Sequence, residues 1–151
     1  MNKLVIGMVL VVSSLAFADS LEEKRIKADA EKLLQFDVSK MNKSCKATVP
    51  DTGVIDWSTW RDVKDPAGGS TKVHSQCGYV AYAMDLTCAN GNDKIAQDTI
   101  AKDVKRLVCM GDAGADLRLE LLKDGTLVIH TSFAVKETVN KTKGWLAKNL
   151  P

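Results

Sequence analysis

Residues 117–133 read LRLELLKDGTLVIHTSF, and this stretch decides the fold class. Apolar and polar side chains alternate before and after its central Asp-Gly dipeptide. This is the pattern of two half-buried strands joined by a tight turn. The stretch therefore predicts an antiparallel hairpin with strands over 117–122 and 126–133.

The register of this hairpin follows from the requirement that its apolar residues share one face. A two-residue loop at the Asp-Gly dipeptide would place polar residues opposite apolar ones. A three-residue loop at 123–125 instead places Leu121 opposite Leu127 and puts His130 on the outer face of the sheet. Because Gly125 then occupies the left-handed position that such a loop requires, we expect the three-residue loop.

Helical patterns surround the hairpin. Apolar residues recur at helical spacing from about residue 21 to 36 or beyond, and again from about 136 to 149. Residues 71–88 fit a helix stripe, although part of this run also alternates like a strand, and another helix is expected to start at Asn92. Leu107, Val108 and Cys109 lie directly before the β-rich stretch and suggest a third strand near residues 105–109. We therefore expect an α+β domain in which about four helices surround a small antiparallel sheet.

The composition is that of a globular protein with one domain. The chain has 151 residues, of which 45% are hydrophobic and 26% are charged, and its net charge is +2. This charge leaves no basic excess for contacts with phosphates, which argues against nucleic acid as a partner. The length is sufficient for one domain and short for two, so we expect a single domain over residues 19–151.

The first 18 residues have the features of a secretory signal peptide. Lys3 is followed by an apolar run and by the small-residue ending Ala16-Phe17-Ala18, a typical cleavage pattern. The apolar run is shorter than the roughly 20 residues of a membrane-spanning helix, although an uncleaved N-terminal anchor is the alternative. We therefore expect cleavage before Asp19, a periplasmic or secreted location of bacterial type, and no transmembrane segment in the mature chain.

Four cysteines lie in the predicted mature chain, at Cys45, Cys77, Cys88 and Cys109. An even number of cysteines in an exported protein predicts two disulfides. Cys77 and Cys88 would lie about 16 Å apart on one helix, which is too far for a disulfide. We favour Cys45–Cys77 with Cys88–Cys109 over Cys45–Cys88 with Cys77–Cys109. The absence of a C-x-x-C pair argues against zinc binding and against thioredoxin-like redox chemistry.

No catalytic motif emerges from the sequence. The chain has no nucleophile elbow, phosphate-binding loop or dinucleotide fingerprint, and its two histidines, His74 and His130, lack a nearby acidic cluster. We therefore assign no catalytic residue, no metal ligand and no cofactor. His74 lies three residues before Cys77, but a cysteine–histidine nucleophile pair would need a free thiol. We expect His130 to be a solvated strand residue.

Two tryptophans provide the one functional hint that the sequence contains. Trp57 and Trp60 lie in a polar, loop-like segment, and an exposed tryptophan usually contacts a partner or a sugar ring. The alternative is that one or both fill the core of a domain that has few aromatic residues. We retain Trp57 and Trp60 as candidate binding residues, and we expect Trp145 to lie in the core.

These observations favour a small exported protein that acts by binding and has no catalytic activity. The expected partner is another protein or a component of the cell envelope. Two alternatives stay open: a hydrolase that uses Asp or Glu residues the sequence does not single out, and a carrier with an apolar pocket between helices and sheet. An exposed Trp57 or Trp60 would favour partner binding, two acids converging in a cleft would favour an enzyme, and an apolar cavity would favour a carrier. The sequence does not predict the oligomeric state.

Overall fold

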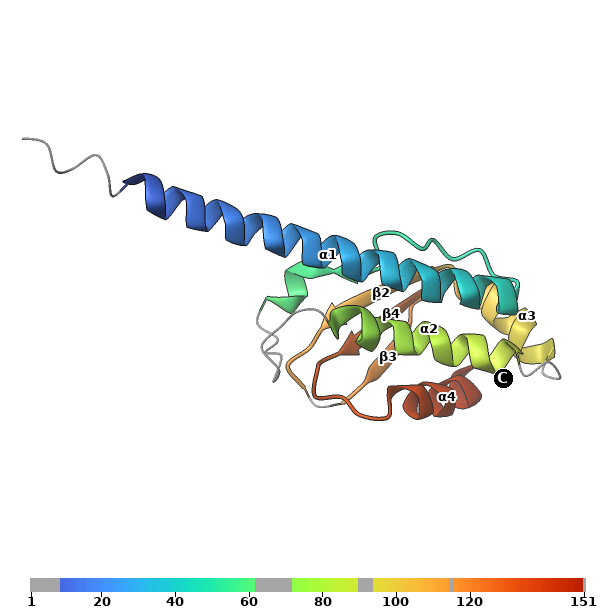
Figure 1. The fold of residues 1–151 in the computed structure, drawn as a ribbon. Helices are drawn as coiled ribbons and strands as arrows, with labels where there is room; N and C mark the ends of the chain where they lie inside the picture. The colour runs from blue at the N-terminus through green and yellow to red at the C-terminus, as the bar shows by residue number, and fades with distance from the viewer. Residues whose placement is uncertain (1–8, 62–71, 90–93, 115, 151) are drawn as a thin grey trace, which may run out of the picture.

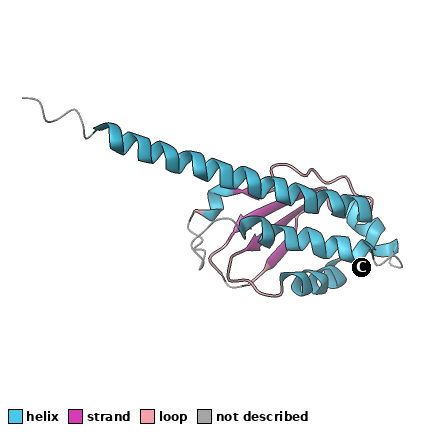
Figure 2. Ribbon diagram, in the orientation of Figure 1, coloured by secondary structure: helices cyan, strands magenta, loops and turns pink. Residues whose placement is uncertain are grey.

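The computed structural model describes residues 9–61, 72–89, 94–114 and 116–150. Its elements in chain order are α1 (Val9–Cys45), β1 (Ile55–Asp56), the short 3-10 helix η1 (Trp57–Trp60), α2 (Val73–Ala89), α3 (Lys94–Asp103), β2 (Arg106–Gly111), β3 (Arg118–Leu121), β4 (Thr126–Thr131) and α4 (Thr138–Asn149). Figure 1 shows the course of the chain, and Figure 2 separates the helices from the strands. The predicted α+β class is confirmed, with four α-helices and the expected third strand in the described residues.

Within the described residues the strands form one four-stranded sheet in the order β1-β2-β4-β3. Strands β3 and β4 form the antiparallel hairpin in the predicted register, with Leu121 opposite Leu127. Gly125 has a φ of 84°, the left-handed conformation that the three-residue loop requires. The sheet as a whole is mixed and not antiparallel as predicted, because β2 lies parallel to both β1 and β4. Helices α2 and α3 provide the crossover that parallel neighbours such as β1 and β2 need.

Helices α1, α2 and α4 lie side by side on one side of the sheet and point in the same direction (Figures 1 and 2). Near the starts of α4 and α2, Thr138 Oγ1 donates a hydrogen bond to Gln76 Oε1 at 3.5 Å. Near the ends of α1 and α2, Ser44 Oγ donates to Asp85 Oδ1 at 2.5 Å. The parallel course arises because β1 and β4, which run in the opposite direction, precede α2 and α4.

The core lies between this helical layer and the sheet. On β2 and β4 the residues that face the helices are Leu107, Cys109, Leu127 and Ile129, and each is at most 1% exposed. Burial of one such aliphatic side chain stabilises the fold by about 1.5–3 kcal/mol. Because side chains alternate along a strand, His130 lies on the outer face of the sheet, as predicted.

The helices follow the predicted periodicity, with different ends. α1 begins at Val9, earlier than expected, because neither glycine nor proline interrupts its sequence. The helical interpretation of residues 71–88 is confirmed by α2, and the strand alternative is wrong. The expected start of the third helix at Asn92 lies outside the described residues. α4 begins at Thr138 and not at 136, since Glu137 adopts a left-handed φ of 57° that precedes the first turn.

The two disulfides join Cys45 to Cys88 and Cys77 to Cys109, with Cα–Cα distances of 5.0 and 5.8 Å. The favoured pairing of Cys45 with Cys77 and Cys88 with Cys109 is therefore wrong, whereas the exclusion of a Cys77–Cys88 bridge is confirmed. The physical reason is the parallel course of α1 and α2, which brings the last turns of the two helices together. Cys77 lies near the start of α2 and is joined to the underlying strand β2.

The disulfides also bear on location. Two disulfides indicate an oxidising compartment, because cytosolic thiols are normally kept reduced. Among the described helices, none combines the length and the apolar character needed to cross a membrane. Cleavage before Asp19, export and a single domain over 19–151 stay predictions, and residues 1–8 of the predicted signal peptide lie outside the described part of the chain.

Candidate functional site

The two tryptophans selected from the sequence lie at the two ends of η1 and have different environments. Trp60 is 7% exposed and packs edge-on against Phe133, with ring centroids 5.3 Å apart. The Nε1–H of Trp60 has no hydrogen-bond partner among the described residues. Trp60 therefore offers little surface to a partner, and its main role in the described structure is packing.

Trp57 is half-buried and is held against α1. Its Nε1–H donates to Glu31 Oε1 at 2.8 Å, and Lys27 Nζ lies 5.7 Å from the centroid of its ring. The segment before it is fixed as well, because the Asp56 side chain accepts a hydrogen bond from the Ser58 N–H at the start of η1. A binding role for Trp57 and Trp60 stays a prediction. Trp145, expected in the core, is half-buried against it.

A row of polar side chains lies along the contact between α1 and α2. Asp37 and Ser44 come from α1, and His74 and Asp85 come from α2. Asp85 is 8% exposed and accepts the hydrogen bond from Ser44, while His74 Nε2 shares a 3.2 Å hydrogen bond with Ser75 Oγ. His74 Nδ1 is buried and has no partner among the described residues. We call Asp37, Ser44, His74 and Asp85 the polar seam.

The polar seam changes the acidity of Asp37. Burial raises the pKa of the Asp37 carboxyl above its ordinary value, because desolvation penalises the charged form. The positive charges of His74 and Lys40 oppose this shift, and the negative charge of Asp85 adds to it. Asp37 also lies directly against the backbone of Gly78, where a Cβ atom would clash with its carboxyl oxygen. The absence of a side chain at Gly78 thus allows the close approach of the two helices.

The polar seam does not support the enzymatic alternative. Nucleophilic catalysis by Cys77 with His74 is excluded, because the Cys77 thiol is bound in a disulfide. Asp37 lies at Gly78 and Asp85 lies at Ser44, seven residues farther along both helices, so the two carboxyls lie about 10 Å apart along the helix–helix interface. They line neither of the two pockets described in this structure. Among the described residues no group of three His, Cys, Asp or Glu side chains could hold a metal ion.

On the outer face of the sheet, His130 lies opposite Arg118. Arg118 Nη2 donates to Asp112 Oδ2, and the N–H of Gly114 donates to Asp112 Oδ1 at 2.9 Å. The Gly114 hydrogen bond, followed by that from Arg118, lowers the pKa of Asp112. These contacts close the segment between β2 and β3, so a structural role accounts for this group.

A second surface is defined by four exposed apolar or aromatic side chains on the helical layer. They are Leu33 and Phe36 on α1, with 51% and 63% of their surface exposed, and Tyr79 and Tyr82 on α2, with 45% and 42% exposed. We call these four residues the aromatic face. In each helix they lie opposite the buried stripe that contacts the sheet.

The contact between α1 and α2 places Phe36 and Tyr79 at similar levels on two adjacent helices. Asp37 on α1 touches Gly78 on α2, and Phe36 and Tyr79 are their immediate sequence neighbours. Lys40 Nζ lies 5.4 Å from the centroid of the Phe36 ring, at the border of this surface. The sequence analysis missed the aromatic face. The sequence does contain two i, i+3 pairs of apolar or aromatic residues on predicted helices. Such a pair indicates an exposed surface only when the buried side of the helix is known.

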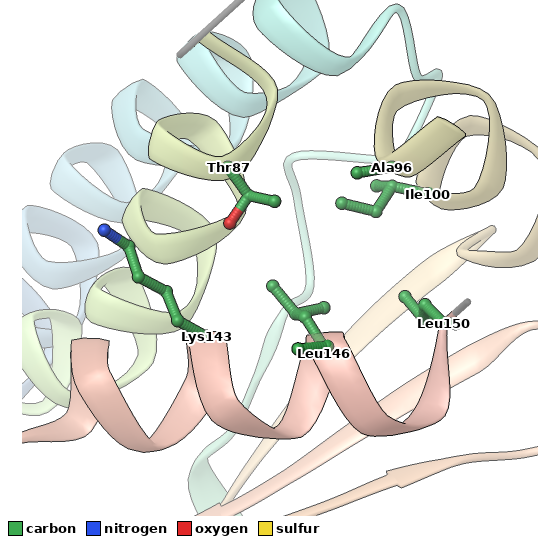
Figure 3. A pocket seen from close by; sticks show the side chains of 7 residues that line it. Thr87, Ala96, Ile100, Lys143, Leu146 and Leu150 are labelled. Carbon is green, nitrogen blue, oxygen red and sulfur yellow. The ribbon is translucent and has the colours of Figure 1, made fainter. Parts of the chain in front are cut away.

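A pocket of about 260 Å3 lies between α2, α3 and α4. Figure 3 shows Lys143 at one side of this pocket and Ile100 and Leu150 at the other, with Leu146 between them. Thr87 of α2 and Ala96 of α3 complete the lining that Figure 3 labels. The carrier alternative predicted an apolar pocket between helices and sheet, whereas this pocket lies between helices. We call it the three-helix pocket.

Comparison with known proteins adds no assignment, since no family model, curated protein or solved structure matches the chain. The aromatic face and the three-helix pocket are therefore interpreted from their own geometry.

Proposed function

We propose that this chain is an exported, non-catalytic binding protein of the cell envelope, and that it holds a protein partner on its aromatic face. The observation that supports this proposal is the clustering of exposed apolar groups. Among the described residues from Leu21 onward, seven large hydrophobic side chains are exposed, and four of them, Leu33, Phe36, Tyr79 and Tyr82, lie on the outward sides of the adjacent helices α1 and α2. Single exposed hydrophobic residues are common, but a cluster is typical of an interaction site.

The chemistry of the aromatic face suits a protein partner. Tyrosine is enriched among the residues that dominate binding energy, because its ring buries a large area and its hydroxyl forms hydrogen bonds. Lys40 at the border adds a positive charge that a partner's carboxylate can pair with. The contact region expected from the sequence, at Trp57, would be separate, because Trp57 binds Glu31 on the side of α1 away from Leu33.

The scaffold beneath the aromatic face is rigid, which favours binding. The Cys45–Cys88 bridge joins α1 to α2 covalently, and the Ser44–Asp85 hydrogen bond joins them one residue earlier on α1 and three residues earlier on α2. A surface held in its binding conformation loses less conformational entropy when a partner binds. Two parallel helices locked in this way present Phe36 and Tyr79 in a fixed arrangement.

Site-specific photocrosslinking in intact producing cells tests the proposal. Benzoylphenylalanine is placed at Phe36, at Tyr79 and, as a control, at Ile95, which is 67% exposed on α3 and lies outside the aromatic face. We expect the first two positions to give the same discrete protein adduct and the Ile95 position to give none. A Tyr82→Ser substitution should lower the yield of the Phe36 adduct by about tenfold, in line with the loss of a binding hot spot.

Two results would count against this function. The first is the absence of a discrete adduct at both positions of the aromatic face. The second is an equal yield of the same adduct at Ile95, which would indicate collision and not docking. Sedimentation of the purified chain distinguishes a foreign partner from a second copy, because a self-associating chain forms the complex alone.

A further inference from the structure

The three-helix pocket is built by contacts that fix three helices around it. Gln97 Nε2 of α3 donates to the Cys88 carbonyl oxygen at the end of α2 at 2.8 Å. The Leu150 N–H donates to the Leu146 carbonyl oxygen at 2.9 Å and closes the end of α4. The Cys45–Cys88 disulfide further anchors the last turn of α2 beside Thr87. The walls are therefore preorganised, as is usual for small-molecule sites.

One end of the pocket is apolar. Ile100, Leu146 and Leu150 belong to the hydrophobic core and present part of their side chains to the cavity (Figure 3). The volume of about 260 Å3 is below the range of about 300–1,000 Å3 that holds drug-sized ligands. The occupant must accordingly be small and must carry a short hydrocarbon group.

The other end carries a positive charge. Lys143 lines the pocket with its side chain, and Figure 3 shows its ammonium group at the outer edge of the pocket, on the side away from Ile100 and Leu150. This ammonium group forms no hydrogen bond or ion pair with any residue in the described part of the chain. Thr87 Oγ1 already donates its proton to the Ala83 carbonyl oxygen at 2.8 Å, so its hydroxyl can only accept a further hydrogen bond. Lys143 is consequently the one cation of the lining, and it matches a single negative charge.

We propose that the three-helix pocket binds a small amphipathic monocarboxylate. The carboxylate pairs with the Lys143 ammonium at the outer edge of the pocket, and the hydrocarbon tail packs inside on Ile100, Leu146 and Leu150. A carboxylate fits better than a phosphate, because one lysine compensates one charge and the lining contains no arginine for bidentate phosphate binding. This site is independent of the aromatic face, so the failure of one proposal does not affect the other.

Titration of the purified, disulfide-bonded chain with octanoate tests the proposal, with binding followed by NMR shifts of the Ile100 and Leu146 methyl groups. Octanol serves as a neutral ligand of the same tail, and octylamine as a ligand of opposite charge. We expect octanoate to bind more tightly than octanol. We expect no binding of octylamine, because the ammonium group of octylamine would face Lys143.

Three variants separate the charge from the cavity. Lys143→Gln should weaken octanoate binding by about tenfold or more, because one charged contact is lost. The affinity for octanol should not change. Lys148→Gln removes a lysine from the same helix outside the lining and should change neither ligand. Ala96→Leu fills the pocket and should weaken both ligands. Absence of methyl shifts with octanoate, or equal binding of all three ligands with no effect of Lys143→Gln, would overturn the proposal.

Discussion

At the scale of single residues, burial of the charged Asp37 carboxyl group lowers the stability of the folded protein. Its folded pKa lies above its unfolded value, so the folded state binds more protons than the unfolded state between these two values. The free energy of unfolding therefore falls as pH rises from about 4 through the raised pKa of Asp37. The lost stability is not regained at neutral pH, where Asp37 is charged in both states.

This linkage predicts the behaviour of Asp37→Asn. The amide has the same shape as the carboxyl group and carries no charge, so the substitution should raise the midpoint of urea unfolding at pH 7. At pH 3, where Asp37 is protonated in both states, variant and parent should unfold at nearly the same urea concentration. A stabilisation of equal size at both pH values would show that the charge of Asp37 is not its cause.

Gly125 is a second residue whose chemistry is imposed by its position. A Cβ atom there would lie 2.9 Å from the Asp103 carbonyl oxygen and 2.6 Å from Lys105 Cγ, and φ is 84°. Gly125→Ala should therefore lower the free energy of unfolding by about 2–4 kcal/mol, from the left-handed backbone and from overpacking together.

Gly53→Ala is the matched control for this prediction. Gly53 also has a positive φ, of 66°, but a Cβ atom there would meet nothing within 4 Å. Its substitution should cost about 1–2 kcal/mol, the contribution of the backbone alone. Equal losses for the two variants, measured by chemical denaturation, would mean that the contact with Asp103 and Lys105 is not a source of destabilisation.

At the scale of elements, the packing of α1 against α2 depends on the small size of Gly78. A Cβ atom at Gly78 would meet the Asp37 carboxyl group, which is the end of a flexible side chain and can move aside, so Gly78→Ala should destabilise the protein by no more than about 1 kcal/mol. Gly144 lies within α4, where a Cβ atom would meet nothing within 4 Å. Gly144→Ala should instead stabilise the protein by about 0.5–1 kcal/mol through helix propensity.

A double-mutant cycle connects the effect at Gly78 to its cause. In an Asp37→Ala background the clash is relieved, so the added methyl group at position 78 should become neutral or stabilising. The free energies of unfolding of the four proteins provide the measurement. If Gly78→Ala is equally harmful with and without Asp37, another neighbour must oppose the methyl group.

The elements differ in how far the sequence determines them. The hairpin and its register were predictable, because alternation and one turn residue act over a few neighbouring positions. The parallel insertion of β4 between β2 and β3 was not, since it depends on a crossover of the whole chain. One local signal was present: Leu127, Val128 and Ile129 are successive and all buried, as expected for a strand in the middle of a sheet.

At the scale of the whole molecule, the disulfide pattern depends on helix direction. The sequence excluded Cys77–Cys88 by distance but could not show that α1 and α2 run parallel, and the favoured pairing was wrong for this reason. The candidate sites depended on the same information. Trp57 and Trp60 were selected by residue type, whereas the aromatic face and the three-helix pocket arise from residues that only the tertiary structure brings together.

Non-reducing peptide mapping of the exported protein should find Cys45 linked to Cys88 and Cys77 linked to Cys109, with an N-terminus at Asp19. Replacing either pair by alanine should lower the free energy of unfolding by about 2–5 kcal/mol, with similar losses for the two pairs, because their sequence separations of 43 and 32 residues are close. A free thiol or another pairing in the exported protein would contradict the structure, and an N-terminus at Met1 would contradict the predicted cleavage.

The shared direction of α1, α2 and α4 gives the domain an electrical polarity. Peptide dipoles add along each helix to roughly half a negative charge at its carboxyl end, and the three carboxyl ends lie at the same end of the molecule. Lys43 and Lys148 lie in the last turns of α1 and α4, but the last turn of α2 contains no basic residue. The partial negative charge at the carboxyl end of α2 is therefore not offset by a basic side chain in its own last turn.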